Sequence, residues 1–354
     1  MSENRVDSGQ LRDLVRDIFG ACGMGGGDAG LLADSLVYAD LGGVHSHGVL
    51  RVPEYVEKLK EKGVDPRGRP RVERRCGGCL VVDGGNSMGQ VGTHFAMGQT
   101  VEAATEHGIA AAAVRGSNHC GALAYFAEQA LERDMIGLAT TNALPTMAPW
   151  GGAERILGIN PLAVAIPAGQ ERPIVFDAAF SGSSHGKIRV HHQKGLPLPE
   201  GWAMDAEGRP TTDAAAAIDG LLTPIGGFKG TALALIMGVL SSMLSGAAYG
   251  TELGDMESGP RAGEDGHFVL AIKVEAFEEV GRFKERVDAA VRQIHGCRKA
   301  AGVERTWAPG EKEAENRRLY GREGIPLNRV TVEGIAAAAA GLGVDAAGHA
   351  WLEG

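Results

Sequence analysis

One short polar run carries an unusual concentration of reactive side chains. The run His45-Ser46-His47-Gly48-Val49-Leu50-Arg51 contains two imidazoles, a hydroxyl and a guanidinium. An arginine can hold a carboxylate through two parallel hydrogen bonds, and a histidine exchanges a proton near neutral pH. These residue types predict a site that grips a small organic acid and performs acid–base chemistry on the neighbouring atom. A polar turn with an incidental ion pair is the alternative.

A second polar segment, residues 116–122, falls between an expected strand and an expected helix and reads Gly-Ser-Asn-His-Cys-Gly-Ala. Its glycines free backbone N–H groups, and a following helix would present its positive end, so the segment suits a phosphate or pyrophosphate. No G-x-G-x-x-G fingerprint occurs in a strand–turn–helix context. A nucleotide site here is therefore expected to differ from the common doubly wound type.

Further clusters of glycine, proline and polar residues follow along the chain. One contains a lysine that opens an apolar run, and the last is a proline–glycine turn with an acid on its far side. Taken singly, each is explained equally well by a solvated glycine turn. The clusters are residues 141–152 with 158–161, 176–179 with 186–188, 224–230, and 308–311.

The composition is that of a globular enzyme. The chain has 354 residues, 44% hydrophobic and 22% charged, a length that suggests about two domains. With a net charge of -9 and no basic block, nucleic acid and anionic membranes are not expected as partners. The longest apolar run, 231–244, is shorter than the roughly 20 residues of a membrane span and predicts a buried helix. No hydrophobic signal segment follows the polar N-terminus, so a cytoplasmic location is expected.

The cysteines and the paired histidines do not form a recognisable metal site. The five cysteines lack the spacing of a disulfide framework, which predicts reduced thiols. Cys76 and Cys79 form a C-x-x-C pair without a second pair to complete a zinc site, and a turn leading into a strand is expected there. His45 and His47 also lack a third ligand at suitable spacing, so no metal is predicted.

Hydrophobic periodicity predicts helices at both ends of the chain and alternating strands and helices between them. Asp7 or Ser8 should cap the first helix and Asp28 the second, Pro53 should lie in the first turn of the third, and 65–70 should be a linker. The alanine-rich helix near the C-terminus should pack on the first helices, and His191 and His192 should lie in a charged loop. The expected helices are 8–22, 28–39, 53–63, 90–106, 122–132, 229–245, 277–295 and 331–342, and the expected strands are 80–83, 109–114, 136–141, 162–166, 174–177 and 268–274.

The order of these motifs resembles the type-2 malate/L-lactate dehydrogenase family. That family includes ureidoglycolate and sulfolactate dehydrogenases, diketogulonate reductases and piperideine-2-carboxylate (ketimine) reductases. The resemblance runs from about residue 8 to 343 and is specific for the family, not for the substrate. The motifs are Ser46-His47-Gly48-x-x-Arg51, Ser117-Asn118-His119, Ala148-Pro149-Trp150-Gly151-Gly152, Asn160-Pro161, Gly186-Lys187-Ile188, Gly201-Trp202-Ala203, Gly226-Gly227-x-Lys229-Gly230 and Pro309-Gly310-Glu311.

The resemblance implies an α/β (mixed α+β) fold with two parts. Residues 76–296 would form a non-Rossmann NAD(P)-binding domain with a mixed sheet. Residues 1–75 plus 297–354 would form a mainly helical substrate and dimer domain built from both chain ends. A homodimer with the site near the subunit interface, a small carboxylate substrate, and NAD or NADP as cofactor are also implied. No acidic or basic residue in the sequence indicates whether the cofactor is NAD or NADP.

The resemblance also assigns roles to single residues. Ser46 and His47 would be the acid–base pair, Arg51 would anchor the substrate carboxylate, and His119 is the alternative catalytic base. The other substrate-binding positions would be Ile159, His185 and Gly186. The cofactor-binding positions would be His119, Cys120, Gly121, Ala122, Leu123, Ala143, Asp177, Ala178, Ala179, Lys229, Pro309, Gly310 and Glu311.

The chain departs from the family pattern at positions expected to face the substrate or nicotinamide. Ile159 stands where the ketimine reductases carry a threonine that contacts substrate, which puts a plain imino-acid role in doubt. Ala143 replaces a frequent serine, residues 179–181 read Ala-Phe-Ser in place of Ala-Thr-Ser, and His185 replaces a common arginine. The acid–base and anchor positions are intact, so an active enzyme is expected.

The leading hypothesis is hydride transfer between a nicotinamide cofactor and a small 2-hydroxy or 2-oxo acid of malate or lactate type. A reductase of cyclic imino acids is the first alternative, and a homologue that keeps the fold without turnover is the second. A metal-dependent hydrolase built on the histidine clusters is a third class, which predicts activity lost on chelation.

Overall fold

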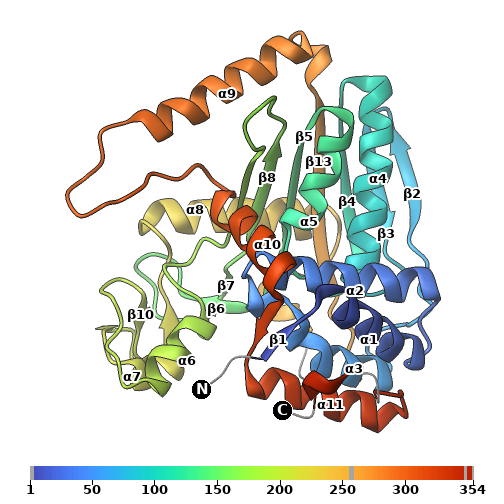
Figure 1. Cartoon of the computed structure of the whole chain (residues 1–354), viewed down its shortest axis with the longest axis vertical. Coiled ribbons are helices and arrows are strands. Elements are labelled where there is room, and N and C mark those ends of the chain that lie inside the picture. The colour runs from blue at the N-terminus through green and yellow to red at the C-terminus, as the bar shows by residue number, and fades with distance from the viewer. Residues whose placement is uncertain (1–3, 255–258, 347–348, 353–354) are drawn as a thin grey trace.

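A seven-stranded mixed sheet forms the centre of the molecule, in the order β2-β3-β4-β13-β5-β8-β9 (Figure 1). The computed structural model describes residues 4–254, 259–346 and 349–352. Within this sheet β3 and β4 pair in parallel and the other neighbours pair antiparallel, so the expected mixed sheet is confirmed. The strands are β2 (Arg71–Cys76), β3 (Cys79–Asp83), β4 (Ile109–Ser117), β5 (Met135–Thr141), β8 (Leu162–Ile166), β9 (Ile174–Ala178) and β13 (Asp265–Lys273).

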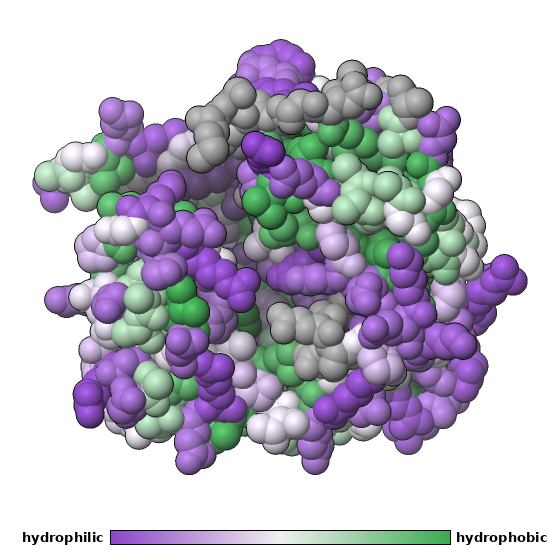
Figure 2. Space-filling model, turned by 90° about the horizontal axis from the view of Figure 1, so that it is seen from below, coloured by the Kyte–Doolittle hydropathy of each residue, from purple (hydrophilic) through white to green (hydrophobic). Residues whose placement is uncertain are grey.

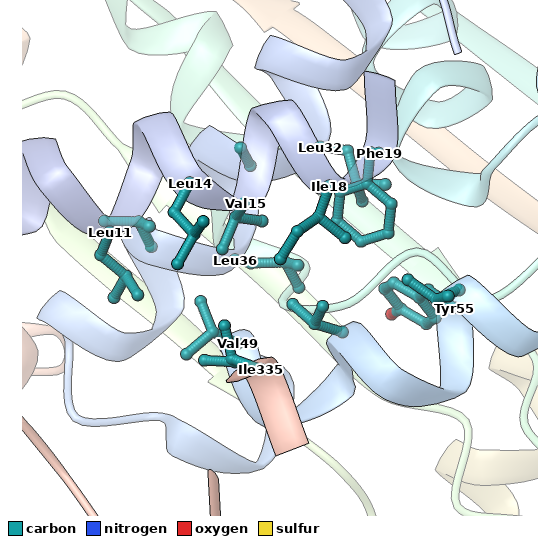
Figure 3. Packing of buried hydrophobic residues seen from close by; sticks show 14 of the residues in the cluster. Leu11, Leu14, Val15, Ile18, Phe19, Leu32, Leu36, Val49, Tyr55 and Ile335 are labelled. Atoms are coloured by element: carbon teal, nitrogen blue, oxygen red, sulfur yellow. The ribbon is translucent and has the colours of Figure 1, made fainter. Parts of the chain in front are cut away.

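Helices from both chain ends share one core. The apolar faces of α1 (Ser8–Ala21), α2 (Gly26–Leu41), α3 (Val52–Lys60) and α11 (Arg329–Leu342) pack together, and Figure 3 shows Ile335 of α11 beside Val49. A short antiparallel pair ties the ends further, β1 (Asn4–Val6) with β14 (Ile325–Leu327). The expected docking of the C-terminal helix on the first helices is confirmed.

Small side chains bring helices close to the central sheet. α4 (Gly89–His107) and α5 (Ala124–Ala127) pack over strands that are rich in alanine, among them β4. Gly137 of β5 has no room for a side chain, because a Cβ there would lie 2.1 Å from the carbonyl oxygen of Ala127. This close approach fixes α5, and with it the segment that precedes α5, against the sheet.

A smaller lobe lies beside the central sheet (Figure 1). Its five strands are ordered β11-β10-β12-β6-β7 and are accompanied by three helices. The strands are β6 (Pro145–Met147), β7 (Leu157–Gly158), β10 (Ala203–Met204), β11 (Pro210–Thr211) and β12 (Leu221–Leu222), and the helices are α6 (His185–Gln193), α7 (Ala214–Ile218) and α8 (Phe228–Gly238).

A long connection, residues 297–310, leads from α9 (Val280–Gly296) back to α10 (Glu311–Glu323) and is called the strap below. α9 lies along one edge of the molecule (Figure 1). α10 was not predicted, because its sequence is charged and lacks an apolar stripe. The strap and α10 close one side of the cavity described below.

Several predicted elements differ from the structure. α5 is a single α-helical turn followed by a 3-10 stretch, Glu128–Arg133, which ends where Asp134 turns left-handed. The predicted helix 229–245 becomes a π-helical turn at Val239–Met243. His191 and His192 lie in α6, because Ser184 caps a helix there.

The start of α2 differs from the prediction, whereas the C-x-x-C segment agrees with it. Asp28 lies in the first turn of α2 but does not cap it, since Gly25 occupies the N-cap without a side-chain bond. Cys76 and Cys79 face each other across the β2–β3 hairpin as free thiols, which confirms the predicted turn.

The face drawn in Figure 2 is mainly hydrophilic, with smaller hydrophobic areas between the charged groups. Among the described residues, the helices are all too short or too polar to cross a membrane.

Candidate active site

The polar run 45–51 folds as two consecutive 3-10 turns between α2 and α3. Asp40, buried near the end of α2, holds both turns: its Oδ1 lies 2.7 Å from His45 Nδ1, and its Oδ2 accepts the Val49 N–H at 2.7 Å. Gly48 lies between these contacts, where a Cβ would come within 2.2 Å of the Asp40 carboxylate. The segment is therefore fixed on a rigid helix end.

This clamp places Arg51 beside the serine and histidine. The Arg51 Nε donates to the Ser46 carbonyl oxygen at 2.8 Å, and its Nη1 donates to Glu54 at 2.7 Å. The Arg51 side chain is 30% exposed. It is therefore oriented by protein groups while donors on its other nitrogen stay available to a carboxylate.

Two histidines meet at this point, although they are far apart in the sequence. The Ser46 Oγ lies 3.0 Å from His47 Nδ1, and the His47 ring stacks on His119 with centroids 5.8 Å apart and planes 12° apart. Burial lowers the pKa of His47 to about 4, aided by the Arg51 charge. Burial likewise places the pKa of His119 well below its ordinary value, with Arg51 and His47 adding to the shift. Both imidazoles are neutral near pH 7.

A cavity of about 470 Å³ opens beside this pair, between the helical core, the edge strand β9 and the strap. Its walls combine apolar residues with a few charged groups, as is usual for a small-molecule site. Many of the predicted site residues line it. They are Ser46, His47, Gly121, Ala122, Leu123, Ile159, Asp177, Ala178, Ala179, Pro309 and Gly310.

Asp177 is the most perturbed carboxylate of the cavity. Solvent reaches it from the cavity, yet the surrounding protein desolvates its carboxyl and raises its pKa to about 6, with Glu313 and Glu128 adding to the shift. Its Oδ2 accepts the Ala124 N–H at 2.8 Å. The sequence predicted that the N–H groups at the start of α5 would bind a phosphate. The Ala124 N–H instead donates to the Asp177 carboxylate, and α5 is only one turn long.

The strap is anchored to the edge strand next to Asp177. The Val175 N–H donates to the Pro309 carbonyl at 3.1 Å, and Gly310, at φ 89°, has no room for a Cβ beside Val175. Glu311 closes the turn by accepting the Ala308 N–H at 2.8 Å and by pairing with His295 Nε2 at 2.8 Å. Glu311 therefore supports the cavity wall from behind.

Cationic and aromatic groups that the sequence did not reveal complete the wall. The Arg317 guanidinium lies 4.1 Å from the ring centre of Tyr38, and the Arg305 guanidinium lies 3.9 Å from that of Trp307. Lys312 also lines the cavity. Lys312 and Arg317 lie in α10, whose sequence shows no pattern that could have indicated this role; only the neighbouring proline–glycine turn is a signal.

The remaining predicted positions do not border the cavity as it stands, and Arg51 and His119 are among them. Cys120 is buried, and Lys229 is exposed in the first turn of α8. His185 and Gly186 open α6, and the Ala143 N–H donates to Asn160 Oδ1 at 2.9 Å. Asn160 also donates to the Ala234 carbonyl of α8 at 2.8 Å, so it links the small lobe to the wall residue Ile159. Within the described residues there is no group of three metal-ligating side chains.

Known proteins share this architecture over nearly the whole chain. A model of the family described as malate/L-lactate dehydrogenase matches residues 6–336. The malate dehydrogenase of Pyrococcus horikoshii is 35% identical over 349 residues, 96% of this chain and 96% of its own. The solved sulfolactate dehydrogenase from Methanocaldococcus jannaschii has a TM-score of 0.92 and 33% identity, over 96% of this chain and 98% of that one. A Delta(1)-pyrroline-2-carboxylate/Delta(1)-piperideine-2-carboxylate reductase of Pseudomonas putida is 32% identical, over 94% of this chain and 96% of its own.

Fold, site and relatives together define an oxidoreductase that works with NAD(P). The chain belongs to the malate/L-lactate dehydrogenase family. The cavity suits a nicotinamide cofactor, because apolar walls lie beside a carboxylate and the cations Lys312 and Arg317.

Proposed function

We propose that this protein oxidises a small 2-hydroxy acid of malate or lactate type, or reduces the corresponding 2-oxo acid. One observation carries the proposal: a single clamped segment holds Ser46 and His47 at a cavity, with Arg51 bonded to the Ser46 carbonyl oxygen and the ring of His119 stacked on His47. A carboxylate anchor and a neutral base at fixed separation are what such an acid requires. Holding the reacting carbon in a defined pose can supply several kcal/mol of the barrier reduction.

The chain's own residues would divide the work as follows. Arg51 binds the substrate carboxylate. His47, neutral because of its low pKa, takes the hydroxyl proton during oxidation and returns it during reduction. Ser46 orients the imidazole through its Oγ contact to Nδ1 and connects it to solvent. Positioned proton transfer of this kind is typically worth about 10²–10⁴-fold in rate.

NAD or NADP would occupy the cavity and supply or accept the hydride. Leu123 and Ile159 offer apolar contact, and Asp177 offers an acceptor for a hydroxyl group. The small lobe would add Ala143 and Lys229 near the cofactor and His185 and Gly186 near the substrate. The remaining proposed contacts are His119, Cys120, Gly121, Ala122, Ala178, Ala179, Pro309, Gly310 and Glu311.

Reduction of a cyclic imino acid is the second candidate, because one relative is named as a reductase of such compounds. Ile159 argues against it. Its side chain lines the cavity and cannot donate or accept a hydrogen bond, so the wall favours an acyclic acid.

A homodimer is the proposed assembly. The predicted buried helix around α8 is in fact half exposed, with an apolar stripe at helical spacing: Phe228 is 64%, Ile236 50% and Met243 54% exposed. Leu235, Val239 and Leu244 extend it. So large an apolar patch is rare on a monomer and typical of an interface. A second copy of the chain covering this stripe explains the apolar run.

The free thiols support a cytoplasmic location.

The test is a substrate panel followed through the absorbance of the reduced cofactor. Oxaloacetate, pyruvate, sulfopyruvate and piperideine-2-carboxylate are offered with NADH and with NADPH. We expect turnover of an acyclic 2-oxo acid that is lost in His47→Ala. Turnover of the imine alone would favour the second candidate. No turnover with any compound would reject both and indicate a homologue that only binds.

A further inference from the structure

A hydrogen-bonded chain behind the stacked histidines carries a further conclusion. We infer that Gln90 and Tyr55 fix His119 as the neutral imidazole with its proton on Nε2, so that His119 donates a hydrogen bond in the site and His47 exchanges the substrate proton. The second half of this inference rests on the proposed function; the first half does not.

Three separate segments meet in this chain. Tyr55 comes from α3 and Gln90 from the first turn of α4, and both side chains are fully buried. The Gln90 Nε2 donates to the Tyr55 hydroxyl at 3.2 Å, and that hydroxyl lies 2.7 Å from His119 Nδ1. α3 begins directly after Arg51, so Tyr55 and the proposed substrate anchor lie on one continuous segment.

The direction of the chain follows from its donors. Burial raises the pKa of Tyr55, so the hydroxyl keeps its one proton. Its oxygen already accepts from Gln90, and the proton is then available for His119 Nδ1. Turning the Gln90 amide around would leave a buried NH₂ group without an acceptor. As it stands, the atom without a partner among the described residues is the carbonyl oxygen Oε1. Unsatisfied buried carbonyls are tolerated better than unsatisfied N–H groups.

The consequence for His119 is a defined tautomer. Because Nδ1 accepts from Tyr55, a neutral ring must carry its proton on Nε2. Such a ring can polarise the substrate oxygen as a neutral donor, as histidine does in some other enzymes. It has no free lone pair with which to take a proton. His47 differs, because its Nδ1 contacts the exposed hydroxyl of Ser46.

The chemical step then balances. During oxidation the substrate's C2–H bond would break, and its electron pair would leave with the hydrogen as hydride, for which bound NAD(P) would be the acceptor. The hydroxyl proton passes to His47, and the C–O bond becomes a carbonyl. The carbonyl oxygen still accepts a hydrogen bond from His119 Nε2–H. His47 releases the proton to solvent past Ser46. Tyr55 and Gln90 act only through His119 and are positioning residues.

Nuclear magnetic resonance of the full-length protein labelled with ¹⁵N-histidine tests the tautomer without any substrate. The His119 signals are assigned by their loss in His119→Asn. We expect a protonated Nε2 and an unprotonated Nδ1 at pH 7. Tyr55→Phe should remove the preference for the Nε2–H tautomer. Gln90→Glu cannot donate to the Tyr55 hydroxyl and should reverse that preference. Tyr125→Phe is the matched control, since the Tyr125 hydroxyl bonds Asp34 instead.

A protonated Nδ1 in the wild-type protein would overturn the inference. An Nε2–H tautomer unchanged in both Tyr55→Phe and Gln90→Glu would also overturn it, because the chain would then not set the tautomer. Kinetics supply the second arm. Tyr55→Phe should lower kcat about 10-fold or more, since loss of a polarising donor costs up to about 10²–10³-fold, with KM changed less than about twofold. An equal loss in Tyr125→Phe would reduce Tyr55 to a structural role. Failure of the substrate panel would reject the proposed function while the tautomer result stood.

Discussion

At the scale of single residues, Arg51 is the proposed anchor for the substrate carboxylate. Its Nε donates to the Ser46 carbonyl oxygen, and its Nη1 donates to Glu54. A lysine could reach the same place but could not make the paired contact to a carboxylate.

We therefore expect Arg51→Lys to raise KM for the 2-oxo acid about 10- to 100-fold, as expected for loss of a charged hydrogen bond. Cofactor affinity, measured by fluorescence titration, should stay unchanged. Arg16→Lys, on the exposed face of α1, is the control. An unaltered KM in Arg51→Lys would remove this residue from the carboxylate role.

The low pKa of His47 gives a second prediction at this scale. A base is active when neutral, so activity in the oxidative direction should be lost only as pH falls through about 4. With cofactor saturating, kcat/KM for the hydroxy acid should be flat from about pH 8 to pH 6. A single-proton loss of kcat/KM centred near the ordinary histidine pKa would contradict the assigned base.

At the scale of elements, regular periodicity decided which helices and strands could be predicted from the sequence. The helices α1 and α3 were predicted because each buries one regular face. Six of the seven strands of the large sheet were also predicted, whereas the mostly exposed β2 was not. The small lobe was missed, because its strands are two or three residues long and held by turns. α10 was missed because its residues line the cavity and do not form an apolar stripe that faces the core. The cavity residues from segments 45–51 and 116–123 were predicted, but their meeting depends on long-range packing.

His267 tests the central strands. It joins β4 and β5 to β13 through Ser117 Oγ at Nε2 and Thr141 Oγ1 at Nδ1, each at 2.8 Å. Burial lowers its pKa from 6.5 to about 3. Between these values the unfolded chain binds the extra proton, so the free energy of unfolding must fall as pH falls.

His267→Gln should lack this dependence. Between about pH 6 and pH 4, the stability difference between wild type and His267→Gln should change by about 1.4 kcal/mol per pH unit. Urea unfolding at several pH values measures it. Parallel pH curves for the two proteins would show that His267 is not buried neutral.

The whole molecule joins a helical core from both chain ends to a mixed sheet, with the cavity where they meet. The apolar stripe on α8 is exposed in the single chain, and the proposed second copy would cover it. Light scattering should therefore report a dimer. Ile236→Glu should weaken the dimer at least about 10-fold, since a charge would be buried in the interface. Val330→Glu, at an isolated exposed site on α11, should not. A monomeric wild-type protein would contradict the assembly.

The most direct test of hydride transfer follows the atom that moves. Nicotinamide cofactor carrying deuterium at both C4 positions is supplied with the 2-oxo acid that turns over, and the product is analysed by mass spectrometry and proton resonance. The account predicts one deuterium at C2 of a single hydroxy-acid enantiomer, with no label transferred by His47→Ala above background. Product without deuterium at C2, or cofactor oxidation without hydroxy acid, would contradict it.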